Sequence, residues 1–361
     1  MLALSSGVCL VALAACGSGD VTGAANGQVT LLTAAMPETL NPVAGYANTG
    51  KGKINEGLLT LRGTADGLPD LVPNLAAALP KISPDAKTWT VTLTPDVTFS
   101  DGSALDSEDV VATYRAIADE KSASPIAGDL VNLKSVEAVD EETVRFTLEA
   151  PQVSFGTLLL IGIAPSEKIT LGQKVEESTL NQEPVGTGPY VVQSFSPERL
   201  VLEPSPTYRG DAPQIKKIVY VVAADDNTRA QRMTAGEFDG TVLPPRLAET
   251  FSDRDDFEVV AAKTADWRGL SLPYDNPFTA DPAARLALNI GIDREAIIDG
   301  VLAGRGRSAS GFVPPEYGEL TTPTRRSPST PTGPTRCSRT PAGSAARTES
   351  GPRGQNVPLS R

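Results

Sequence analysis

The fold class is decided by residues 218–243, which read IVYVVAADDNTRAQRMTAGEFDGTVL. The first part, Ile218–Val222, is apolar on both faces, which is typical of a central strand buried on both sides. A helix is predicted from Asn227 to about Thr234, and a short strand is predicted at Thr241–Leu243. Strands and helices are therefore mixed, which indicates an α/β or α+β fold.

Upstream of this stretch, several segments have the alternating pattern of half-buried strands. Residues 88–93 (TWTVTL) place Trp89, Val91 and Leu93 on one face, and residues 142–148 (ETVRFTL) repeat the pattern. The segments VVQSF and RLVLE after Tyr190 predict an antiparallel pair, and residues 28–34 predict a first strand. Both alternating and continuous strand patterns occur, which favours more than one lobe.

Three helices are also predicted from their start signals and their spacing. Asp106 can cap a helix whose inward positions are Val110, Val111, Tyr114, Ile117 and Ala118. Two further helices are expected at residues 281–289 and 294–302.

The composition narrows the possible chemistry. The chain of 361 residues carries a net charge of -12, so nucleic acid is not expected as a partner. It contains no histidine, which removes the commonest general base and metal ligand. Its three cysteines are far apart and have no metal-type spacing, so we expect no metal and no cofactor. After the N-terminus no apolar window is long enough to span a membrane.

The N-terminus has the pattern of a bacterial secretion signal. Residues 1–15 form an apolar region that ends in small residues before Cys16, and Leu13–Cys16 resembles a lipobox. This resemblance implies cleavage before Cys16, acylation of its thiol, and a flexible tether over residues 16–27. A plain secretory signal with a chance cysteine is the alternative.

The C-terminal part differs in composition from the rest. Residues 321–361 contain seven arginines, seven prolines and one acidic residue, with only Val357 and Leu359 as large aliphatics. Such a segment cannot build a core. The abrupt change favours a shift of reading frame over a native disordered tail.

A series of motifs follows along the chain: PETLNP (37–42), LVPNLAAAL (71–79), the block 85–114, SASPIAGDL (122–130), PVGTGPYVVQSF (184–195), YRGDAPQIKKIVYVV (208–222) and RLALNIGIDREAIIDGVLAGRG (285–306). In this order they resemble the extracellular solute-binding proteins of family 5, which serve oligopeptide, dipeptide and nickel ABC transporters. The resemblance implies a helix at Leu71–Leu79 and, from Pro184, a strand that returns to the first lobe.

The resemblance implies a two-lobed fold of the periplasmic binding-protein type II class, with an extra small subdomain. The family continues well past GFVPP (311–315), so the second lobe is expected to be incomplete and ligand closure weaker than normal. The expected parts are a signal peptide (1–15), a tether (16–27), a first lobe (28–54 and 184–268), a subdomain (55–183), the start of a second lobe (269–318) and a disordered or out-of-frame tail (319–361).

The resemblance also implies a function and its partners. The chain is expected to be a monomeric lipoprotein on the outer face of the cytoplasmic membrane, capturing a peptide-like solute for the permease subunits of an ABC importer. A non-functional remnant of such a receptor is one alternative. A cell-envelope enzyme is a weaker one, because the sequence has no histidine and no nucleophile elbow.

Candidate ligand-binding residues follow from the same resemblance. Glu38 follows the first strand and could accept a bond from an amino group, while Tyr46 and Trp267 could line the cleft. The alternative for Glu38 is a solvated acid on a loop, and the alternative for each of the two aromatic residues is packing in the core or on the surface. Three residues of the returning strand are expected to supply backbone geometry for a hinge: Gly186, Gly188 and Pro189.

Overall fold

The computed structural model describes residues 27–50, 52–63, 68–261 and 266–309, together with 313, 314 and 317. The predictions for the signal peptide, for Cys16 and for the segment 319–361 lie outside the described residues. Two compact units are present. The first contains the described residues up to Trp267 and those from Glu295 onward, and the second contains residues 268–294.

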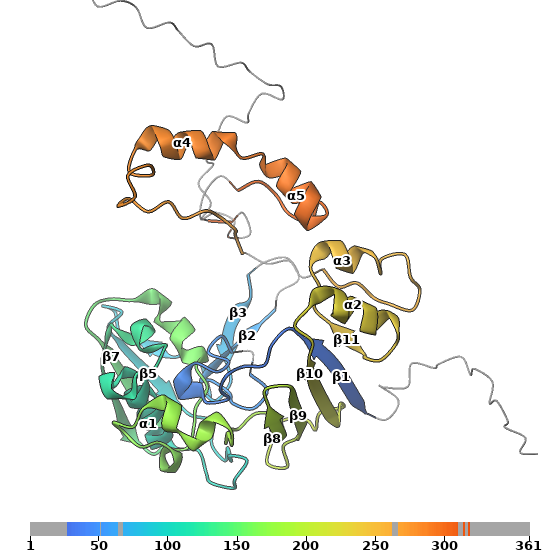
Figure 1. Ribbon diagram of the computed structural model, residues 1–361. Helices are drawn as coiled ribbons and strands as arrows, with labels where there is room; N and C mark the ends of the chain where they lie inside the picture. The colour runs from blue at the N-terminus through green and yellow to red at the C-terminus, as the bar shows by residue number, and fades with distance from the viewer. Residues whose placement is uncertain are drawn as a thin grey trace, which may run out of the picture. The chain divides into compact units, whose positions relative to one another are not determined.

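A five-stranded sheet organises one part of the first unit (Figure 1). Its central strand β10 pairs in parallel with β1, and β1 pairs in parallel with β11. On the other side of β10, strands β9 and β8 continue the sheet in antiparallel fashion. The order is β11 (Gly240–Thr241), β1 (Gln28–Thr33), β10 (Lys217–Val222), β9 (Arg199–Pro204) and β8 (Tyr190–Ser196).

A second sheet belongs to the segment inserted between β1 and β8. It has the order β4 (Lys81–Ile82), β5 (Thr88–Thr92), β7 (Thr143–Leu148) and β6 (Leu133–Asp140), and it packs with helix α1 (Ser107–Ala118). A separate pair, β2 (Leu59–Arg62) and β3 (Asp70–Pro73), contributes Leu61 and Leu71 to the same core. Short 3-10 helices connect these elements, at Pro42–Ala44, Glu120–Ser122, Ala127–Leu130, Val153–Leu160, Ser166–Lys168, Val175–Glu177 and Thr179–Asn181.

The inward faces predicted for the alternating strands are confirmed. Trp89, Val91 and Phe146 are at most 4% exposed, and Phe146 packs between the rings of Tyr114 and Phe155. The predicted cap of α1 is also confirmed, because Asp106 accepts a hydrogen bond from the backbone of Glu108 at 2.8 Å. The predicted antiparallel pair is β8 and β9.

Three local predictions are wrong. Residues 71–79 form no helix: β3 occupies their first part, where Leu71 pairs with Leu61, and bends follow. The strand predicted at Thr241–Leu243 ends at Thr241, so Val242 lies beyond the ladder. Ala118 is exposed at the end of α1, although Ile117 of the same turn is fully buried in the core.

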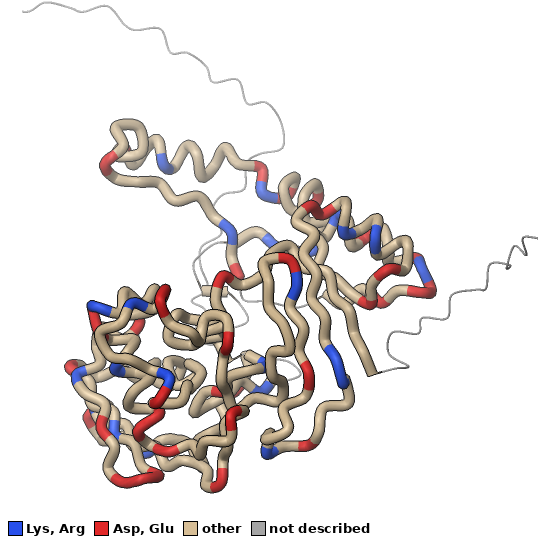
Figure 2. The backbone as a smooth tube through the Cα atoms, turned by 60° about the horizontal axis from the view of Figure 1, so that its bottom comes forward, with Lys and Arg blue, Asp and Glu red and all other residues tan. Residues whose placement is uncertain are grey.

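The remaining helices are α2 (Asp226–Thr234), α3 (Pro245–Glu249), α4 (Pro282–Gly291) and α5 (Arg294–Leu302). Figure 1 shows α2 and α3 beside the β11 edge of the five-stranded sheet. Acidic and basic residues are interspersed along the described chain (Figure 2). Over the described residues, no helix has both the length and the apolarity that a membrane span needs.

Candidate functional site: the carboxyl edge of the first sheet

The three parallel strands of the first sheet end at one edge. Because β11, β1 and β10 run in the same direction, the backbone segments that follow them emerge side by side. Ala223 N donates to Thr33 O at 2.9 Å, and Thr241 Oγ1 donates to Leu32 O at 3.0 Å. Ligands of open α/β sheets bind outside the carboxyl ends of the strands, so this edge is the candidate solute site.

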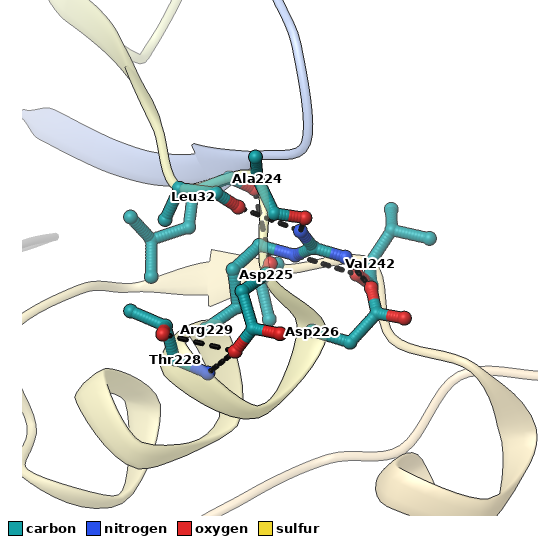
Figure 3. A network of polar contacts seen from close by, with 9 residues as sticks. Leu32, Ala224, Asp225, Asp226, Thr228, Arg229 and Val242 are labelled. Carbon is teal, nitrogen blue, oxygen red and sulfur yellow. Dashed lines mark hydrogen bonds and ion pairs between the residues drawn. The ribbon is translucent and has the colours of Figure 1, made fainter.

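A buried arginine holds this edge together (Figure 3). Arg229 of α2 is 4% exposed, and its Nη1 donates to the carbonyls of Ala223 at 2.6 Å and Ala224 at 2.9 Å. Its Nε donates to Val242 O at 3.4 Å, and its Nη2 pairs with Asp226. One side chain therefore connects the exits of β10 and β11, meaning the backbone segments that directly follow these two strands. The two strands lie on either side of β1.

The N-terminus of α2 is capped by the side chain of Asp225, the residue that directly precedes the helix. Asp225 accepts hydrogen bonds from Thr228 N at 2.7 Å and Thr228 Oγ1 at 3.0 Å. These bonds lower the pKa of Asp225, because they stabilise its charged form. The cap thus satisfies a free amide of the first turn.

Glu38 lies on the loop that leaves β1. Its side chain is exposed, and its carboxylate forms no ion pair or hydrogen bond with any residue that the structure describes. The loop around it is fixed, since Leu40 N donates to Asn181 O at 3.1 Å and Thr39 Oγ1 donates to Asn181 Oδ1 at 2.7 Å. The Glu38 carboxylate is therefore a hydrogen-bond acceptor without a partner among the described residues, on a loop that other residues hold in place.

Tyr46 lies against the sheet. It packs on the apolar cluster formed by Leu40, Ile54 and residues of β8, β9 and β10, which also includes Tyr220. Burial, together with the nearby phenol of Tyr220, raises the pKa of Tyr46 to about 12. Its ring therefore contributes to packing, and only part of its surface is available to a solute.

The glycines of the returning strand lie where the chain crosses between the two sheets. A Cβ on Gly186 would be 2.2 Å from Ile54 O, and one on Gly188 would be 2.5 Å from Lys53 O. Gly188 N donates to Ile54 O at 2.8 Å, so the outgoing and returning segments are in direct backbone contact. Pro189 follows this contact, and its carbonyl accepts from Ser205 N at 2.9 Å. Neither glycine has a positive φ, so the requirement at both positions is space.

Among the described residues, Tyr46 belongs to the apolar cluster on the first sheet, and the other two candidate ligand residues, Glu38 and Trp267, do not. Trp267 is 52% exposed and is the last residue of the first unit before the second begins. The sequence interpretation missed the buried Arg229 and its bond to the backbone of Val242. A signal existed for Arg229, because it lies four residues before Met233, which is 6% exposed, and both point inward from α2.

Comparison with known proteins places this geometry in a class. NikZ from Campylobacter jejuni, solved in complex with Ni(L-His), shares the fold with a TM-score of 0.70 at 24% identity, over 79% of this chain and 57% of that chain. The fold is thus that of the ABC-transporter substrate-binding proteins.

The family model for bacterial extracellular solute-binding proteins, family 5 Middle, matches residues 70–331. The chain therefore belongs to family 5 of the extracellular solute-binding proteins, a family of binding proteins rather than enzymes. Protein XP55 of Streptomyces lividans is 41% identical over 288 residues, covering 80% of this chain and 52% of that protein. A putative ABC transporter peptide-binding protein of Brucella ovis is 28% identical over 250 residues, covering 68% of this chain and 47% of the relative. The chain spans about half the length of these relatives.

Proposed function

We propose that this chain captures a peptide-like solute outside the cytoplasmic membrane and delivers it to the permease subunits of an ABC importer. Its membership of family 5 carries the proposal. The carboxyl edge of the first sheet supports it, because Glu38 offers an uncommitted carboxylate there that can accept from an amino group.

A nickel chelate is the second candidate solute, because a relative, the nickel-binding periplasmic protein of Escherichia coli, is 28% identical over 320 residues. The chain contains no histidine, so its own side chains supply no imidazole to a metal. The edge offers carboxylate and backbone groups, which suit the amino and amide groups of a peptide.

Isothermal titration calorimetry on the full chain separates the two solutes. Tri-alanine and a nickel complex of L-histidine serve as the probes. Saturable heat with tri-alanine supports the peptide proposal. Binding of the nickel complex alone would replace it with the second candidate, and binding of neither would contradict both.

The proposed function includes a location, the outer face of the cytoplasmic membrane, where a lipid would anchor the protein. Cys16 is the residue that would carry the lipid, which keeps a monomeric receptor near its permease and raises their effective concentration. Metabolic labelling with a radioactive fatty acid is expected to mark the wild type and not a Cys16→Ser variant. Equal labelling of both would contradict the anchor without affecting the solute proposal.

A further inference from the structure

The carboxyl edge carries an apolar side chain in an unusual setting. Val242 directly follows β11 and is 84% exposed. Single exposed apolar residues are common on protein surfaces and need no explanation by themselves. Here, however, the backbone of the exposed residue is fixed from the inside, because its carbonyl accepts from the buried Arg229 at 3.4 Å.

The buried position of Arg229 has a cost in desolvation free energy, and its bonds join particular backbone segments. Taking a guanidinium out of water carries a large desolvation penalty, which is offset only if its donors are satisfied. Three backbone carbonyls and the carboxylate of Asp226 accept from four of its five N–H groups here. The planar fork of an arginine holds its donors in a fixed geometry that bonds the exits of two strands at once, whereas a lysine ammonium is a compact charge with three rotatable donors.

The consequence is a fixed direction for one side chain. With its carbonyl bonded inward, Val242 projects outward at the edge where the exits of β11, β1 and β10 meet. We propose that Val242 is a specificity-determining residue that contacts an apolar side chain of the solute, and that Arg229 is the positioning residue that holds it there. This inference rests on the proposed function, since it places the solute at this edge.

Contact with Val242 would act by removing apolar surface from water. A valine has no donor or acceptor, so it favours solutes with an aliphatic or aromatic group over equally long polar ones. Glu38 and Val242 would then recognise different parts of one molecule, the first an amino group and the second an apolar side chain.

The test compares two peptides of equal length and charge, tri-leucine and tri-serine, by calorimetry on the full chain. Wild type is expected to prefer tri-leucine, and Val242→Ser is expected to reduce that preference about fivefold. Val153→Ser is the matched control, because Val153 is also exposed, at 83%, but lies on a 3-10 helix of the inserted segment. The control is expected to keep the wild-type preference.

Arg229→Lys separates positioning from stability. A purely structural arginine would lower the melting temperature and weaken both peptides equally. A positioning role is expected to reduce the preference for tri-leucine over tri-serine as Val242→Ser does. Because Val242 is on the surface, its serine variant remains informative even if Arg229→Lys does not fold.

The outcomes separate a failure of the proposed function from a failure of the inference about Val242. If wild type binds neither peptide, the proposed function fails, and this inference fails with it. If wild type prefers tri-leucine and Val242→Ser retains that preference, only the inference is overturned. A wild type that binds both peptides equally would also overturn it.

Discussion

The guanidinium of Arg209 forms an ion pair with the carboxylate of Glu56, across 153 residues of sequence. Arg209 Nη2 donates to Glu56 Oε1 at 3.2 Å and to Asn74 Oδ1 at 2.9 Å. Arg209 lies between β9 and β10, whereas Glu56 precedes β2 and Asn74 follows β3. This bridge therefore fastens the β2–β3 pair to the first sheet.

Replacing Arg209 with methionine is expected to destabilise the protein by about 2 kcal/mol, because it leaves the Glu56 carboxylate, 9% exposed, without its cation. The value lies below that of a fully buried pair, since the Arg209 side chain is 25% exposed. Urea unfolding measures the change. Arg62→Met is the control, because its pair with Asp70 is 3.8 Å long and mostly exposed. It should cost no more than about 0.5 kcal/mol, and an equal loss in both variants would contradict the role of the bridge.

Gly186→Ala is expected to cost about 3 kcal/mol, because the new Cβ would overlap the carbonyl of Ile54 and force the crossing segments apart. Gly128→Ala is the control: nothing lies within 4 Å of its Cβ position, and its φ is not positive. We expect the control to change stability by less than about 1 kcal/mol. Thermal unfolding of both variants checks the difference. If Gly186→Ala melts like the wild type, the close approach has no energetic consequence.

The Tyr46 phenol is expected to remain protonated after an ordinary tyrosine, with a pKa near 10, has ionised. Its folded pKa of about 12 lies above the unfolded value, so the folded state binds the proton more tightly. Its contribution to stability is fully present below pH 10 and is lost as the pH rises from about 10 to 12. In Tyr46→Phe the decline of unfolding free energy over that window should be smaller. The difference in tyrosinate absorbance between the two proteins should have its midpoint near pH 12, and a midpoint near pH 10 would contradict the burial argument.

Glu38→Gln is expected to weaken binding of tri-alanine about fivefold, because a neutral amide accepts more weakly than a carboxylate from a charged amine. The loss should disappear with N-acetyl tri-alanine, which has no such amine. Calorimetry with both peptides measures the effect. Glu142→Gln, in the turn between β6 and β7, changes the same charge away from the edge and should leave both affinities unaltered. A loss that is equal for both peptides would assign Glu38 another role.

The sequence determined the local elements because each depends on neighbours along the chain. The alternation around Val91 predicted β5 and its buried face, and Asp106 predicted the start of α1. The order of the motifs identified the family. The helix expected at Leu71–Leu79 does not form, because the first residues of this segment pair with β2. This tertiary contact outweighs the local similarity to the family motif.

Only the tertiary structure decided how distant segments meet. No periodicity shows that β1 pairs in parallel with β10, that Arg209 reaches Glu56, or that Arg229 binds the exits of β10 and β11. A long side chain carries no sequence signal for the carbonyls that it will bond. The sequence indicated that Gly186 is needed for backbone geometry. The reason for a glycine there is that a Cβ would lie 2.2 Å from the carbonyl oxygen of Ile54, and this close approach exists only once the two crossing segments are folded together.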